Sequence, residues 1–190
     1  DREMHEIAGS RLRLEMELRQ ARDRREFNVH YQPIVALESG QIEGFEALAR
    51  WSAAGGPVPP YEFIPLAEEI GTIFDLEQQI LHCVCRDIRR WRERFGDSSP
   101  YVSVNLSGKE LANAGFADHV RDILAQYGVE PSWIRFEVTE SSIVENAEVA
   151  AGVLARLRAL GVRVYIDDFG IGYSSLSSLH SYPIDTLKID

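Results

Sequence analysis

The stretch RVYIDDFGIGYSSL (163–176) decides the fold. The apolar run Val164–Ile166 leads into two adjacent carboxylates, Asp167 and Asp168, and a loop rich in glycine and serine follows. A short apolar run that ends at turn-forming residues is typical of a buried strand. Carboxylates at the end of such a strand need a cation, a proton or solvent. The stretch therefore predicts a buried strand with a polar site at its carboxyl end, and we expect the order of the loop to depend on substrate or metal.

Strand and helix patterns alternate on either side of this stretch. Strands are expected at 28–35, 42–50, 101–107, 133–140, 163–170 and 186–190, and helices at 73–95, 116–128 and 142–160. Segment 52–63 is rich in glycine and proline and is expected to be a loop. Alternation of strands with helices after the first two strands predicts parallel β/α units. The predicted fold class is α/β.

Polar residues recur near the carboxyl ends of these strands. In a β/α barrel these ends form the floor of the active site, so we expect their side chains to converge. Carboxylate and amide oxygens suit Mg²⁺ or Mn²⁺ rather than zinc, because no histidine or cysteine accompanies them. Two adjacent aspartates can contact different ions, as in two-metal phosphoryl chemistry. The residues in question are Glu46, Asn105, Glu137, Asp167, Asp168 and Lys188.

Simpler interpretations of the same residues stay open at this point. A polar residue in a strand is commonly an edge or ion-pair residue, and aspartate before glycine is common in turns. The residues alone support a metal site and ordinary polar positions about equally. Asp-Phe-Gly does not indicate a kinase, because the glycine-rich, Val-Ala-Ile-Lys and His-Arg-Asp motifs are missing. Trp51 suits either stacking on a base or core packing.

Composition narrows the class of protein. The chain has 190 residues and a formal net charge of −10, which argues against a nucleic-acid polymer as partner. No apolar run approaches the length of a membrane span. Cys83 and Cys85 are spaced unlike zinc ligands and are expected to be reduced, which indicates a cytoplasmic setting.

The chain resembles the EAL domain family. Seven motifs carry the resemblance, in family order over residues 28–190: YQPIV (31–35), FEALAR (45–50), FIPLAEE (63–69), SVNLS (103–107), FEVTES (136–141), DDFGIGYSSL (167–176) and LKID (187–190). The resemblance implies the EAL fold, a modified TIM-type β/α barrel. It also implies that the barrel is incomplete here, because the chain ends at Asp190 before the last two strands. Segment 1–27 resembles the connector helix that follows an upstream GGDEF domain.

The resemblance also implies an activity and a site. The activity is metal-dependent hydrolysis of the bacterial second messenger cyclic di-GMP to linear pGpG, in biofilm and motility signalling, with two Mg²⁺ or Mn²⁺ ions. It assigns a first ion to Glu46, Asn105, Glu137 and a bridging Asp167, a second ion to Asp168, and the positioning of the attacking water to Lys188. It assigns substrate contacts to Gln32 and Arg50, and support of the loop after Asp168 to Glu140.

Three classes of function remain as alternatives. The intact ligand set favours the hydrolase. For the 190-residue chain alone, both activity and inactivity stay open. A non-hydrolysing module that binds cyclic di-GMP as a receptor is the second, and a dimerising regulatory platform built on the charged first helix is the third. The expected partners are cyclic di-GMP, upstream GGDEF and sensory domains in the same polypeptide, and a second copy in a homodimer. A membrane anchor in an upstream region stays open.

Overall fold

The structure is a computed structural model that describes residues 2–96, 99–170 and 182–189. Its elements divide between two compact units, Asp1–His30 with Ala49–Ile80, and Tyr31–Leu48 with Leu81–Asp190. In chain order the elements are α1 (Arg2–Arg24), β1 (Phe27–Val35), β2 (Ile42–Ala53), β3 (Gly56–Val58), α2 (Pro60–Ile70), α3 (Ile73–Phe95), β4 (Tyr101–Asn105), α4 (Gly108–Leu111), α5 (Phe116–Tyr127), the 3₁₀ turn η2 (Pro131–Trp133), β5 (Ile134–Thr139), α6 (Glu140–Val144), α7 (Ala147–Leu160), β6 (Arg163–Asp167) and β7 (Thr186–Leu187).

The strands form one sheet in the order β1-β2-β4-β5-β6-β7, with β3 paired to β2. Every pair from β2–β4 to β6–β7 is parallel. The prediction of parallel β/α units is therefore confirmed. Within the described residues the sheet is open, since β1 and β7 stand at its two ends.

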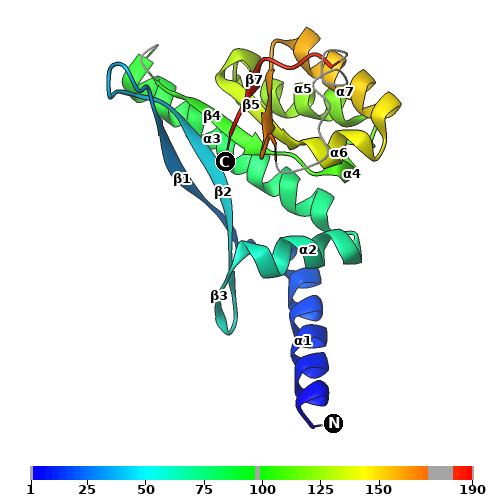
Figure 1. The fold of residues 1–190 in the computed structure, drawn as a ribbon. Coiled ribbons are helices and arrows are strands. Elements are labelled where there is room, and N and C mark those ends of the chain that lie inside the picture. Colours follow the sequence, from blue (N-terminus) through cyan, green and yellow to red (C-terminus); the bar gives the residue numbers. More distant parts are fainter. Residues whose placement is uncertain (1, 97–98, 171–181, 190) are drawn as a thin grey trace. The chain divides into compact units, whose positions relative to one another are not determined.

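The two faces of the sheet in the second unit differ in chemistry. One face carries buried apolar side chains from β4, β5 and β6, and Phe116 of α5 packs on Phe136 with ring centroids 5.7 Å apart. Figure 1 shows α5 and α7 beside these strands. Because side chains alternate along a strand, the intervening positions point to the opposite face. We call that opposite face the inner face; its side chains include Glu46, Ser103, Asn105, Glu137 and Asp167.

An aromatic cluster fixes the orientation of β1 in the second unit. The ring of Tyr31 packs against Trp91 at 4.8 Å and Phe45 at 6.3 Å, and its hydroxyl donates to Asp87 Oδ2 at 2.9 Å. Phe45 alternates with Glu46 along β2, so this cluster lies on the apolar face. Gln32, next to Tyr31, therefore points to the inner face.

The first unit has its own aromatic core. Trp51 packs against both Phe27 and Phe63, at centroid distances of 6.1 and 5.9 Å, and those two rings also pack against each other at 6.2 Å. Its indole Nε1 donates to Glu26 Oε2 at 3.0 Å, and only 1% of the residue is exposed. Of the two interpretations of Trp51, core packing is therefore the correct one.

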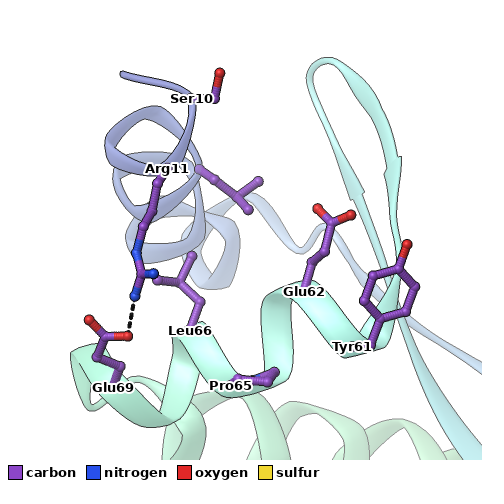
Figure 2. Close-up of a pocket in the computed structure, with 8 residues that line it drawn as sticks. Ser10, Arg11, Tyr61, Glu62, Pro65, Leu66 and Glu69 are labelled. Carbon is purple, nitrogen blue, oxygen red and sulfur yellow. Dashed lines mark hydrogen bonds and ion pairs between the residues drawn. The ribbon is translucent and has the colours of Figure 1, made fainter. Parts of the chain in front are cut away.

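Helix α1 is held against α2 in the same unit. Leu18 and Ala21 of α1 are buried. A hollow of about 600 Å³ is lined by residues of the two helices. Figure 2 shows these residues, with an ion pair between Arg11 and Glu69. No helix within the described residues combines the length and the apolar character needed to cross a membrane.

Two of the expected elements are wrong. Segment 52–63 is not a loop: β2 continues to Ala53, Gly56 at φ +116° turns the chain into β3, and α2 begins at Pro60. Proline is favourable at the first position of a helix because its missing N–H is not needed there. The helix expected at 142–160 is two helices, α6 and α7, with Asn146 at φ −141° between them.

The last strand is shorter than expected, because β7 covers only Thr186–Leu187. The predicted loop GIGYSS (170–175) lies outside the described residues after Gly170.

Candidate active site

Strand register brings the predicted polar residues to one part of the inner face. Glu46 of β2 pairs with Ser103 of β4, and Asn105 of β4 pairs with Glu137 of β5. Asp167 pairs with Thr139 at the carboxyl end of β6. Because paired residues of parallel strands point to the same face, their side chains share one surface.

Lys188 joins these side chains. Its Nζ lies 2.5 Å from Glu137 Oε2, 3.2 Å from Asp167 Oδ1 and 3.6 Å from Glu46 Oε2. Its backbone N–H donates to the Ile166 carbonyl at 2.7 Å, which fixes it beside β6. Asn105 Nδ2 donates to Glu46 Oε1 at 3.0 Å. The structure thus brings together five of the six residues predicted at the strand ends, and we call Glu46, Asn105, Glu137, Asp167 and Lys188 the strand-end cluster.

Burial sets the electrostatics of the cluster. The Glu137 side chain is completely buried, whereas that of Lys188 is 28% exposed. Burial raises the pKa of Glu137, and the hydrogen bond from Lys188 opposes that rise. Burial alone lowers the pKa of Lys188, but the hydrogen bond and charge of Glu137 and the charge of Glu46 raise it above its usual value. Lys188 is therefore a cation throughout the physiological pH range.

The residues fit a hard divalent cation by their chemistry. The donor set is three carboxylates and one amide, and Glu137 Oε1 is buried and accepts no hydrogen bond from the described residues. In the described part of the chain no three histidine, cysteine, aspartate or glutamate side chains are grouped so that they hold a metal ion. The Lys188 ammonium instead lies among the carboxylates and offsets their charge. The two-metal site stays a prediction.

Four predicted site residues lie outside the cluster. Asp168 is exposed one residue past β6, at φ +53° in the left-handed region, which aspartate tolerates better than most residues. Gln32 is exposed on β1, and Glu140 is the first residue of α6. The loop that Glu140 is expected to support lies outside the described residues. Arg50 belongs to the first unit, where Nη1 donates to the Ala49 carbonyl at 2.8 Å.

The sequence interpretation overlooked other residues of the inner face. Arg135 is buried, donates from Nε to the Tyr165 hydroxyl at 3.0 Å and lies over the Tyr101 ring at 4.3 Å. Ser103 is also fully buried there. Each of these residues lies two or four positions before a predicted ligand on the same strand. They are Tyr101 and Ser103 of β4, Arg135 of β5 and Tyr165 of β6. Because every second side chain of a strand points to the same face, this spacing from the predicted ligands identifies them.

Comparison with known families decides the identity of the fold. The family model described as EAL domain matches residues 15–190. The chain belongs to the EAL domain family. Among curated proteins, this EAL domain is 42% identical over 188 residues to the bifunctional diguanylate cyclase/cyclic di-GMP phosphodiesterase MucR of Pseudomonas aeruginosa, which covers 98% of the chain and 27% of MucR. It is 41% identical over 184 residues to the cyclic di-GMP phosphodiesterase NbdA of the same organism, covering 96% of the chain and 23% of NbdA.

A solved structure gives the same result for the fold. The MucR phosphodiesterase in complex with cyclic di-GMP superposes with a TM-score of 0.88 at 42% identity, covering 94% of this chain and 72% of that one. The open α/β sheet of this EAL domain is thus part of a TIM-like barrel, and the predicted fold class is confirmed. The chain spans about a quarter of the length of the two curated relatives.

Proposed function

We propose that this EAL domain hydrolyses cyclic di-GMP to linear pGpG in a metal-dependent reaction. The observation that carries the proposal is the strand-end cluster, in which three carboxylates converge on one lysine and the Asn105 amide donates to one of those carboxylates. The names of MucR and NbdA, two relatives with more than 40% identity, supply the substrate class.

The cluster residues have separate roles in this proposal. Glu46, Asn105, Glu137 and Asp167 would hold one divalent ion, and Asp168 would contribute to a second. Bound there, such ions polarise the phosphate and lower the pKa of a bound water. Water attacks phosphorus, and one P–O bond of the ring breaks as the new P–O bond forms. The proton that the water loses is balanced by one taken up by the leaving ribose oxygen, and the ring opens to the linear dinucleotide.

Lys188 contributes a fixed positive charge to the same reaction. Its ammonium has three donors, and the surrounding carboxylates hold it at the strand ends. It can orient the attacking water and offset negative charge that develops on the phosphate. Gln32 on the inner face and Arg50 are proposed to contact the dinucleotide, with Arg50 suited to a bidentate contact to phosphate.

The context of the domain is part of the proposal. We infer that α1 connects this domain to an upstream GGDEF domain, since the relative MucR is bifunctional by name. We also propose that the domain forms a homodimer and that it lies in the cytoplasm.

The test uses the complete natural protein and chromatographic detection of pGpG. With Mn²⁺ or Mg²⁺, the wild type should convert cyclic di-GMP to pGpG. Glu46→Ala and Asp167→Ala should each abolish turnover, because each removes a carboxylate of the cluster. Cys83→Ser serves as a control, since Cys83 lies on α3 outside the cluster, and should leave turnover nearly unchanged. Near-normal turnover in either cluster variant would contradict the assignment.

A receptor module that binds cyclic di-GMP without cutting it is the second candidate. The observation that favours it is the pairing of Lys188 with all three carboxylates, which offsets their charge without a metal ion. The same assay separates the two functions, because the receptor would bind the nucleotide and release no pGpG.

A further inference from the structure

We propose that Ser103 is a positioning residue for Glu137, whose Oε1 accepts a hydrogen bond from the Ser103 hydroxyl and is thereby oriented toward the cation. The inference rests on the proposed function, because it concerns the metal that the strand-end cluster would hold. It assigns a role to a residue that does not itself contact substrate.

Strand register places Ser103 between two of the carboxylates. Ser103 pairs with Glu46 on one side and with Arg135 on the other. Glu137 lies two residues beyond Arg135 on β5, so it points to the same inner face. Glu137 is therefore the diagonal neighbour of Ser103 across the β4–β5 pair, and its side chain is long enough to span such a separation.

The Ser103 hydroxyl and the Glu137 carboxylate are both buried, and each can supply the hydrogen-bond partner that the other lacks among the described residues. Ser103 and Glu137 are 0% and 1% exposed. Neither Ser103 Oγ nor Glu137 Oε1 forms a hydrogen bond of ordinary geometry with the described residues. A hydroxyl can donate and a carboxylate oxygen can accept. Because buried polar groups that stay unpaired are costly, a small rotation or a single bridging water that joins the two is favoured.

The contact of the second Glu137 oxygen, Oε2, explains why the interaction between Ser103 and Oε1 matters. Lys188 holds Oε2 at 2.5 Å, so among the described residues Oε1 is the carboxylate oxygen left without a partner. Although burial raises the pKa of Glu137, the nearby Ser103 hydroxyl acts in the opposite direction. With both oxygens held, the plane of the carboxylate is fixed. Outer groups that orient a metal ligand in this way affect metal affinity without touching the metal.

A second buried serine supplies a matched control. Ser99 is 7% exposed, and its hydroxyl also lacks a hydrogen-bond partner among the described residues. It precedes β4 and lies outside the strand-end cluster. Ser99→Ala therefore removes the same group at a similar depth without altering the surroundings of Glu137.

The experiment measures Mn²⁺ affinity in the complete protein without nucleotide, by electron paramagnetic resonance of free Mn²⁺. Ser103→Ala should weaken Mn²⁺ binding by roughly 10–100-fold. Ser103→Thr keeps the hydroxyl and should restore affinity close to wild type, and Ser99→Ala should leave it unchanged. If Ser103→Ala does not fold, Ser103→Cys takes its place, because a thiol is a weak donor of similar size.

Wild-type affinity in folded Ser103→Ala or Ser103→Cys would overturn the proposal, as would a wild type that binds no Mn²⁺. Hydrolysis is scored separately as pGpG formed by the wild type. A protein that binds Mn²⁺ with the predicted pattern but forms no pGpG would support Ser103 as a positioning residue and refute the hydrolase.

Discussion

At the scale of single residues, Lys188 is the central group of the strand-end cluster. Its ammonium lies within 3.6 Å of three carboxylates, one of which is completely buried. Removing one partner of a buried ion pair is costly because the other charge is left uncompensated. The cluster therefore depends on a positive charge, whether lysine or metal.

Lys188→Met tests this dependence on charge. In metal-free protein, the variant should lose about 3–5 kcal/mol of stability, the cost of leaving the buried Glu137 carboxylate unpaired. Added Mn²⁺ should recover more stability in the variant than in the wild type, because the ion replaces the missing charge. Thermal unfolding with and without Mn²⁺ measures both effects. Equal Mn²⁺ effects in the two proteins would contradict the claim that the ion replaces the charge of Lys188.

Residue type and strand position were enough to predict most of the cluster. Glu46, Asn105, Glu137, Asp167 and Lys188 all lie near strand ends, and parallel pairing brings such ends together. Ser103 was missed because a serine inside a strand is ordinary until its burial is known. Lys188 was predicted to act on water or phosphate, but its contacts with three carboxylates needed the register of β6 and β7.

At the scale of elements, close packing between strands limits the size of the side chain that fits at some positions. Gly44 of β2 pairs with Tyr101 of β4, whose ring covers it. A Cβ added at Gly44 would lie 2.4 Å from that ring. Tyr101 is in turn covered by Arg135 at 4.3 Å, so the ring has little room to move.

Gly44→Ala should therefore destabilise the protein by about 1–3 kcal/mol, the usual cost of overpacking. Gly152→Ala on α7 is the control, since no atom of the described residues outside the local helix lies within 4 Å of its added Cβ. That change should stabilise by about 0.5–1 kcal/mol, because alanine is the better helix former. Chemical denaturation measures both changes, and equal effects of the two substitutions would refute the packing argument.

His82 of α3 lies against α5, and its partial burial disfavours the protonated form. His82 packs against Tyr127 at 5.6 Å, and burial followed by the nearby charge of His119 lowers its pKa. The unfolded chain then binds a proton more readily than the folded one, so stability is full above about pH 6.5 and falls as the pH drops below it.

His82→Gln should reduce this loss of stability between neutral and mildly acidic pH, measured by denaturation at a series of pH values. His30→Gln is the matched change at an exposed position. An unchanged pH profile in His82→Gln would contradict the role of His82.

Element boundaries were predictable where glycine or periodicity marked them. Helix α3 was predicted at its observed bounds, and Gly128 and Gly161 end α5 and α7 in the left-handed conformation. The break between α6 and α7 was missed because neither Glu145 nor Asn146 is a strong helix breaker. Helix α2 was missed because the prolines before it suggested a loop, although Phe63, Leu66 and Ala67 already follow a helical period.

At the scale of the whole molecule, the chain divides into two compact units. The first is built on Trp51, Phe27 and Phe63, and α1 is anchored there through Leu18. The strand-end cluster belongs to the second unit. Local stability differs between such units when their cores are separate.

Leu18→Ala should loosen the first unit, since removing a buried leucine side chain costs about 2–5 kcal/mol. Hydrogen exchange should accelerate in peptides from 9–30 and 49–80, while β4 and β5 stay protected. Leu12→Ala is the control, because Leu12 is 59% exposed. Equal acceleration in both units would show that they unfold together.

Metal removal tests most directly whether the strand-end cluster acts through a metal ion. The complete protein, stripped of metal by a chelator, is incubated with cyclic di-GMP, and pGpG is followed by chromatography before and after Mn²⁺ is restored. No product without metal and full recovery with Mn²⁺ is the predicted result. Undiminished pGpG formation by protein verified to be metal-free would contradict the claim that the strand-end cluster acts through a metal ion.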